Sequence, residues 1–244
     1  MKVVILHILC EGQTEERFVN DVLKVYLNGF GIICKSQLLL TNKQKNCFGG
    51  MLNYTQVKRD LTLLLQQYKN SESESHWFTT MFDLFRIPDD FPGFHRTFGS
   101  VYDKIHHLEQ ELSKEIADER FISYIQLHEY EALVFAGLGF LEMEYPTSSS
   151  LRKGMNYLCD ILKKAGNNPE LVNTTMAPSK HIVKALGNIH HYNKPKIGSV
   201  VAGKVGVAVL KSTCRHFGEW IDKLEKLKEL PSTTPTRPHS KMTK

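Results

Sequence analysis

Four short apolar runs in the first half of the chain predict buried strands. "KVVILHIL" (2–9), "IICKSQLLLT" (32–41) and "WFTTMFDLF" (77–85) are rich in β-branched, aromatic or threonine residues, as buried strands are. A fourth strand begins in "RFISYIQL" (120–127), and the chain becomes a helix or a turn near Glu129. Each run is short enough to be one strand of a sheet.

Apolar residues at helical spacing separate these runs. They recur every three or four positions in 14–31, 51–70 and 98–116, which predicts three amphipathic helices. Alternation of strands and helices implies right-handed crossovers and a mainly parallel sheet. The sequence therefore predicts an α/β fold, with helices flanking the sheet.

The pattern weakens after residue 140, which divides the chain into three parts. Residues 1–140 form the predicted α/β core, and 141–228 form a helical C-terminal region packed on it. Residues 229–244 are rich in proline, serine and threonine, which predicts a disordered tail. Within the core, the polar stretches 43–50 and 71–76 predict a loop and a solvated turn.

The composition is that of an ordinary globular protein. Of the 244 residues, 41% are hydrophobic and 23% are charged, and no run approaches the 18 apolar residues of a membrane span. A net charge of +5 permits nucleic-acid binding without demanding it. The five cysteines are scattered and form no C-x-x-C pair. This argues against a zinc site or a disulfide framework and favours a cytoplasmic location.

Acidic side chains follow three of the predicted strands. Glu11 comes directly after the first strand, Asp83 ends the third, and Glu129 and Glu131 end the fourth. Ligands of open α/β sheets bind at the carboxyl ends of the strands, where these carboxylates would converge. Carboxylates held close together repel one another, and a hard divalent cation removes that penalty. The sequence therefore predicts a site for Mg²⁺ or Mn²⁺.

Other acidic residues have structural explanations. Glu15 and Glu16 lie in the first turn of a predicted helix, where the helix dipole favours carboxylates. Asp89 and Asp90 flank prolines and are either simple turn residues or further ligands. If this segment is a strand, the side chains of Glu129 and Glu131 lie on the same face of it. If the segment is a helix, they lie on different faces.

Three segments carry a resemblance to a known family. "VILHILCEGQTEERFV", "MFDLFRIPDDFPG" and "IQLHEYEALVF" resemble, in this order, the TOPRIM fold of topoisomerases, primases and overcoming-lysogenization-defect nucleases. They resemble more closely the bacterial TOPRIM-like family known as domain of unknown function 4276. The likeness covers most of residues 1–225.

The resemblance implies a glutamate at Glu11 and an Asp-x-Asp motif that begins at Asp83. The chain departs from the motif because position 85 is Phe85. Asp89, Asp90, Glu129 or Glu131 would then complete the site. The nuclease branch uses further carboxylates downstream, which makes "HEYEAL" (128–133) the best candidate.

Basic residues and histidines offer further candidates. Lys180 lies near the start of a predicted helix, where it could contact phosphate as a catalytic residue, and Lys194 and Lys196 are weaker candidates. His128, next to Glu129, is either a proton carrier or a structural residue. The adjacent pairs 106–107 and 190–191 are expected to be surface or partly buried histidines rather than metal ligands, since neighbours do not share a helix face.

The predicted function is a Mg²⁺-dependent nuclease that cleaves DNA or RNA. Metal-activated water would attack the phosphodiester, with Glu11, Asp83 and Glu129 around the metal. The resemblance implies a role in an anti-phage or mobile-element system with an ATPase partner. A non-catalytic adaptor with a degenerate site and a TOPRIM-type nucleotidyl transferase are the alternatives. The sequence leaves open whether the chain forms a homodimer.

Overall fold

The structure is a computed structural model that describes residues 2–42, 47–48, 51, 53–172, 176–187 and 190–230. Among these residues, the main sheet has five strands and every pairing within it is parallel. The strand order is β2 (Ile32–Leu38), β1 (Val3–Cys10), β5 (Glu74–Asp83) and β6 (Phe121–Ile122), and β7 (Ile125–Gln126) pairs with the end of β5. The α/β fold predicted from the sequence is confirmed.

Strand β1 lies at the centre of the sheet and is buried on both faces. All of its residues except Val3 are buried, which explains why the run is continuously apolar. Leu6 and Ile8 point to one hydrophobic cluster, whereas Leu9 points to the other. Because β1, β5 and β7 run in parallel, their carboxyl ends lie at the same edge of the sheet.

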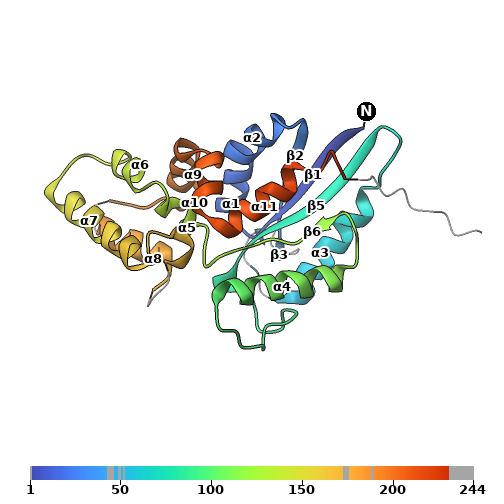
Figure 1. Cartoon of the computed structure of the whole chain (residues 1–244), viewed down its shortest axis with the longest axis horizontal. Helices are drawn as coiled ribbons and strands as arrows, with labels where there is room; N and C mark the ends of the chain where they lie inside the picture. The colour runs from blue at the N-terminus through green and yellow to red at the C-terminus, as the bar shows by residue number, and fades with distance from the viewer. Residues whose placement is uncertain are drawn as a thin grey trace, which may run out of the picture.

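Helices cover both faces of the sheet (Figure 1). One face carries the helical segments from Gln13 to Asn28, which are α1 (Gln13–Phe18), a π-helical turn (Val19–Leu23) and α2 (Lys24–Asn28), together with α11 (Arg215–Glu225). The other face carries α3 (Tyr54–Gln67) and α4 (Val101–Ile116). The side chains of Asn53 and Ser100 cap α3 and α4, as short polar residues do at helix starts.

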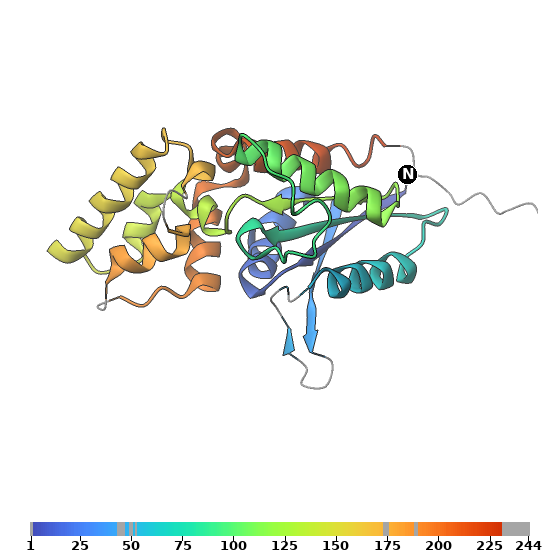
Figure 2. The same ribbon diagram turned by 90° about the horizontal axis from the view of Figure 1, so that it is seen from below.

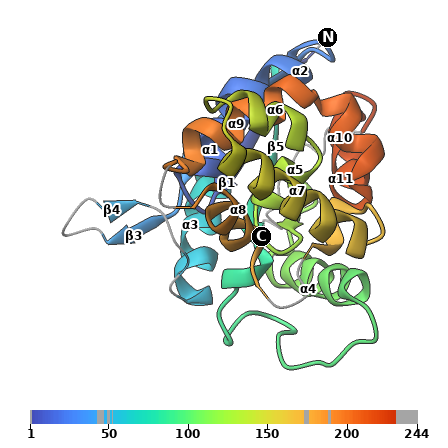
Figure 3. The ribbon, with the colours of Figure 1, turned by 90° about the vertical axis from the view of Figure 1, so that its left-hand side faces the viewer.

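A group of helices lies beyond the carboxyl ends of the strands (Figures 1 and 3). Its members are α5 (Glu131–Phe135), α6 (Leu138–Met143), α7 (Ser149–Lys164), α8 (Pro178–Leu186), α9 (Lys194–Val205) and α10 (Val207–Thr213). They share one hydrophobic cluster with β1 and α11, so these helices and one sheet face have a common core. No helix within the described part of the chain is long and apolar enough to cross a membrane.

Some boundaries differ from those predicted. The prediction of a solvated turn at 71–76 is wrong for its second half, because β5 begins at Glu74. Ser75 and His76 are buried where this strand pairs with β1. The strand at 32–41 ends at Leu38, and a second ribbon follows, in which β3 (Leu40–Asn42) pairs antiparallel with β4 (Cys47–Phe48) (Figure 2). The predicted loop at 43–50 therefore contains a strand.

The C-terminal half also shows finer divisions. Residues 194–225 form three helices, with breaks at Gly206, whose φ of 81° is left-handed, and at Cys214. The proposed boundary at residue 140 stays a prediction. Residues 231–244 of the predicted tail lie outside the described residues.

Candidate functional site

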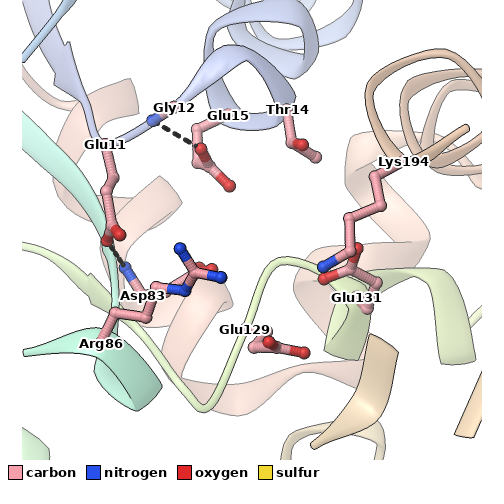
Figure 4. A pocket seen from close by; sticks show the side chains of 9 residues that line it. All are labelled: Glu11, Gly12, Thr14, Glu15, Asp83, Arg86, Glu129, Glu131 and Lys194. Carbon is pink, nitrogen blue, oxygen red and sulfur yellow. Dashed lines mark hydrogen bonds and ion pairs between the residues drawn. The ribbon is translucent and has the colours of Figure 1, made fainter. Parts of the chain in front are cut away.

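An acidic pocket of about 170 Å³ lies at the carboxyl ends of β1, β5 and β7 (Figure 4). In the described part of the chain, the residues that line it are Glu11, Gly12, Thr14, Glu15, Asp83, Arg86, Glu129, Glu131 and Lys194. Five carboxylates thus face two basic side chains. The cavity is large enough for several water molecules or ions. We refer to it below as the carboxylate pocket.

Glu11 is the first residue after β1 and links that strand to β5. Its main-chain N–H donates to the carbonyl oxygen of Met81 at 3.1 Å, and its Oε2 accepts a hydrogen bond from the main-chain N–H of Asp83 at 3.0 Å. The side chain is buried, with 4% of its surface exposed. Strand pairing therefore fixes the position of this carboxylate across the end of the sheet.

Asp83 ends β5 and connects the strand to the segment after β7. Its Oδ1 accepts a hydrogen bond from the main-chain N–H of Tyr130 at 3.0 Å. Protein surrounds the carboxyl group closely, yet the residue keeps some solvent contact where it lines the pocket. Burial, followed by the charges of Glu15 and Glu11, raises the pKa of Asp83 well above its ordinary value.

Glu129 and Glu131 reach the pocket from a turn and a helix start. Of the two arrangements that the sequence left open, a shared strand face does not occur, because β7 ends at Gln126 and His128 turns the chain with a left-handed φ of 61°. Glu129 Oε2 accepts a hydrogen bond from the main-chain N–H of Ser179, at the start of α8, at 3.0 Å. Glu131 begins α5 and forms an ion pair with Lys194, with Nζ 3.2 Å from Oε1.

Glu15 is a pocket residue that sequence reasoning assigned to the helix dipole. Its Oε2 accepts a hydrogen bond from the main-chain N–H of Gly12 at 2.8 Å, so it does cap α1, but its carboxyl group also faces the other acids (Figure 4). Burial and the charge of Glu11 raise its pKa from 4.5 to about 7. The available signal was the "EGQTE" segment itself, in which one turn of helix follows Glu11.

The electrostatics of the pocket favour a bound cation. Burial raises the pKa of Glu11 and of Glu131, and the nearby charge of Glu129 raises both further, whereas Arg86 and Lys194 offset part of this effect. The donor atoms are carboxylate oxygens, without imidazole or thiolate among the described lining residues. Oxygen donors of this kind suit Mg²⁺ or Mn²⁺, so the residues present fit the predicted metal.

Comparison with known proteins places the chain in a family. The family model described as "Domain of unknown function (DUF4276)" matches residues 10–225. The chain belongs to the DUF4276 family. No curated protein matches it.

Two solved structures similar to this DUF4276 chain are C-terminal regions of OLD proteins. The one from Burkholderia pseudomallei has a TM-score of 0.42 and 17% sequence identity, and the match covers 93% of this chain and 98% of that one. The one from Xanthomonas campestris pv. campestris, phased with platinum, has a TM-score of 0.33 and 17% identity, with 91% and 95% covered.

Several predicted residues lie outside the pocket of this DUF4276 chain. Asp89 and Lys180 are exposed and are not among the residues that line it. Asp90 accepts hydrogen bonds from the main-chain N–H of Tyr54 at 2.9 and 3.0 Å, which is a structural role at the start of α3. Catalytic or ligand roles for Asp89 and Lys180 stay predictions, and Lys194 takes the place at the pocket that sequence reasoning gave to Lys180.

His128 is adjacent to the pocket but does not line it. Burial lowers its pKa from 6.5 to about 4, although a hydrogen bond with the main chain of Glu170 and the charge of Glu129 oppose the shift. The imidazole is therefore neutral at physiological pH. Its left-handed backbone conformation directs the chain into the pocket, so its position serves to place Glu129.

Proposed function

We propose that this DUF4276 chain is a TOPRIM-type nuclease that uses Mg²⁺ or Mn²⁺ to cleave phosphodiester bonds in nucleic acid. The observation that carries the proposal is the carboxylate pocket, where two acids from strand ends, one from the turn after β7 and two from the helices α1 and α5 meet two basic side chains. Without a cation, such a cluster would lower the stability of the folded state, since buried like charges repel one another. A metal ion would balance the negative charge of the five acids, and a phosphate group would balance the positive charge of the two basic side chains.

Three side chains would hold the metal. Glu11 and Asp83 come from the ends of β1 and β5, Glu129 comes from the turn after β7, and Glu131 is the further acidic group beside them. When bound, the cation supplies Lewis-acid charge for the phosphate and favours ionisation of a water nucleophile. Hydrogen bonds from the main chain at Asp83, Tyr130 and Ser179 keep the carboxylates in fixed orientations.

The remaining pocket residues would act on the substrate directly. Arg86 and Lys194 carry N–H donors and positive charge at the pocket, where they would contact phosphate oxygens. Glu15 has a pKa of about 7 in the metal-free pocket, and a bound cation would lower that pKa, so its carboxylate would be ionised and able to accept a proton. We assign it the role of holding or accepting a proton during attack on the phosphate.

Phe85 would bind the nucleic acid beside the cleavage site. It stands between Asp83 and Arg86, and 57% of its surface is exposed. An exposed aromatic ring next to an acidic site offers a face on which a nucleic-acid base stacks. The position that the TOPRIM motif gives to a second aspartate would thus serve substrate contact here, while Glu129 and Glu131 supply the missing charge.

The biological setting forms a further part of the proposal. The TOPRIM-like resemblance suggests an ATPase partner and a role in an anti-phage or mobile-element system. The net charge of +5 suits binding to a polyanion. A cytoplasmic location and a homodimer stay predictions.

The test is a cleavage assay with supercoiled plasmid, single-stranded DNA and structured RNA, with and without a cognate ATPase. We expect cleavage in Mg²⁺ or Mn²⁺, none in excess chelator and none with Glu11→Gln. Metal binding without cleavage in the presence of a verified partner would favour the adaptor alternative. Incorporation of nucleoside triphosphates without hydrolysis would favour the nucleotidyl transferase.

A further inference from the structure

A second cluster of potential metal ligands lies where α4 meets α11. His106, His216 and Glu219 each offer one ligand atom, and these atoms all lie within 4.8 Å of one another. The sequence at each helix is H-x-x-E, with His106 and Glu109 on α4 and His216 and Glu219 on α11. The two pairs are crossed between the helices. His106 Nε2 is 3.2 Å from Glu219 Oε2, and His216 Nε2 is 2.9 Å from Glu109 Oε1.

The hydrogen bonds of His216 show which of its ring nitrogens carries a hydrogen. Its Nε2 lies 2.9 Å from a carboxylate oxygen of Glu109 and 3.2 Å from the carbonyl oxygen of Ile125. Both of these groups are acceptors, so Nε2 must carry a hydrogen. Its Nδ1 is buried, and no described residue forms a hydrogen bond with it. The side chain has only 3% of its surface exposed, so this nitrogen also has little access to bulk water.

With Nε2 hydrogen-bonded, Nδ1 is the ring nitrogen that remains for a metal. Burial opposes protonation of His216, but Glu109 raises its pKa, so a metal would displace a proton from Nδ1. Histidines that bind metals usually donate their other ring N–H to a carboxylate or a carbonyl oxygen, which fixes the tautomer and makes the ligand more basic. Glu109 and Ile125 supply both kinds of acceptor to His216. A buried ring nitrogen without a partner is otherwise a cost to the fold.

The other two members of the cluster make it accessible. The side chains of His106 and Glu219 are each 39% exposed, so an ion can reach them from solvent. Arg215 Nε donates to Glu219 Oε1 at 2.9 Å, which leaves Oε2 toward His106. Two imidazoles and one carboxylate suit transition metals such as Zn²⁺ and Co²⁺, whereas Mg²⁺ prefers oxygen ligands.

We propose that His106, His216 and Glu219 bind one transition-metal ion of the Zn²⁺ class and thereby tie α4 to α11. The two helices cover opposite faces of the sheet and meet at its β6–β7 edge, where Ile125 contacts His216. The ion would join the two layers at an edge that has no further strand among the described residues. The sequence predicts that His106 is a surface or partly buried histidine rather than a metal ligand, and its partial burial agrees with the first part. The proposed site could not be predicted from the sequence, because the partners of His106 come from a distant helix rather than from His107.

The test is titration of the metal-free, full-length chain with Co²⁺ in excess Mg²⁺, followed by the visible absorption of the bound cobalt. Excess Mg²⁺ competes for the oxygen ligands of the carboxylate pocket, and Mg²⁺ binds imidazole weakly, so the titration is designed to report imidazole ligands. We expect one tightly bound Co²⁺ per chain, at least about tenfold weaker binding for His106→Ala, and about 10–100-fold weaker binding for Glu109→Gln, which acts through His216. His107→Ala, on the same helix, and Asp83→Asn should bind Co²⁺ like the wild type.

Two results would overturn the proposal. The first is equal Co²⁺ affinity for wild type, His106→Ala and Glu219→Gln, which would place the ion elsewhere. The second is absence of stoichiometric binding by folded wild-type protein.

Glu219→Gln keeps the shape of the side chain, so it serves as the test variant if His106→Ala does not fold. As a second measurement, Zn²⁺ should raise the Tm of the wild type and leave that of either variant unchanged. Since the proposal does not depend on nuclease activity, it stands or falls by metal binding alone.

Discussion

Glu170 and Glu11 are both buried acids, yet the protein surrounds them in opposite ways. Glu170 has no exposed surface, and its oxygens accept hydrogen bonds from the main-chain N–H groups of His216 and Phe217, at the start of α11, and from the hydroxyl of Tyr102. Glu11 accepts a hydrogen bond from the main chain of Asp83 and lies among other carboxylates. Fixed donors and the helix dipole balance the first charge, whereas the second is balanced only in part.

Under the proposed function, this difference separates Glu170, which stabilises the fold, from Glu11 and its neighbours, which bind a cation. A carboxylate whose oxygens are met by main-chain donors stabilises the elements that supply them. A group of carboxylates that share few donors lowers stability until a cation arrives. Substitutions in the two regions should therefore change stability in opposite directions, and only one region should affect catalysis.

The largest expected effect is on catalysis. Asp83→Asn should lower metal-dependent cleavage by about 100-fold or more, because loss of a metal ligand removes several kcal/mol of charge stabilisation. Initial rates on a plasmid or RNA substrate provide the measurement. Asp89→Asn, in the exposed loop six residues later, is the matched control and should retain wild-type rates. Equal loss in both variants would show that the loop also supplies a ligand.

The next effect is on folding. Glu170→Ala should lower the free energy of unfolding by about 3 kcal/mol or more, since two buried N–H groups of α11 lose their acceptor. Urea denaturation followed by circular dichroism measures it. A change below about 1 kcal/mol would mean that the surroundings of Glu170 do not differ in kind from those of Glu11.

Metal should stabilise the carboxylate pocket in the folded state. At a hundredfold excess over its Kd, Mg²⁺ or Mn²⁺ should add about 2.7 kcal/mol to the free energy of unfolding, a rise in Tm of several degrees. Glu11→Gln should abolish this rise, whereas Glu129→Gln should reduce it. Thermal melts in chelator and in millimolar metal make the comparison. The same rise in wild type and Glu11→Gln would indicate binding outside the pocket.

The pH dependence of the metal-free protein offers a smaller effect. The pKa of Glu15 is about 7 in the folded state against 4.5 ordinarily, so the folded state binds this proton more tightly than the unfolded chain does. The stability it contributes is fully present below about pH 4.5 and is lost as the pH rises toward 7. In chelator, the wild type should therefore lose about 3 kcal/mol relative to Glu15→Gln between pH 4.5 and pH 7.5.

The comparison between wild type and Glu15→Gln is needed because other groups also titrate. Burial lowers the pKa of His7 to about 3 and that of His128 to about 4, so their contributions run in the opposite direction and are equal in both proteins. If the free energy of unfolding changed with pH equally in the wild type and in Glu15→Gln, the pKa of Glu15 would not be raised in the folded state.

The smallest expected effect concerns the exposed ring beside Asp83. Phe85→Ala should weaken binding of single-stranded nucleic acid by about 1 kcal/mol, through loss of base stacking, and should leave stability nearly unchanged. Fluorescence anisotropy with a labelled oligonucleotide measures it. Phe140→Ala, which removes another exposed ring on α6, is the control and should bind like the wild type. Equal affinity for all three proteins would remove Phe85 from the substrate site.

Much of this arrangement could be predicted from the sequence, and the limits have physical causes. Strand β1 is recognisable because both of its faces are buried, which makes its sequence continuously apolar. Placing Glu11 and Asp83 at one edge then required only that the strands be parallel. The conformation around Glu129 could not be predicted, because the left-handed turn occurs at a histidine, where no glycine marks it.

Other pocket residues depended on tertiary structure. Glu15 and Glu16 lie in the same helical turn, and only the packing of α1 on the sheet decides that Glu15 faces the strand ends. Lys194 reaches Glu131 from the start of α9, far along the chain, and nothing in its neighbourhood distinguishes it from Lys196. Residues of this kind become visible only when the fold brings distant segments together.

The most direct test of the central claim is a crystal of the protein soaked with Mn²⁺ and measured near the manganese absorption edge. The account predicts an anomalous peak inside the carboxylate pocket, coordinated by Asp83 and by Glu11 or Glu129, and no such peak in crystals of Asp83→Asn. An empty pocket in wild-type crystals at saturating Mn²⁺, with the carboxylates in the positions described above, would contradict it.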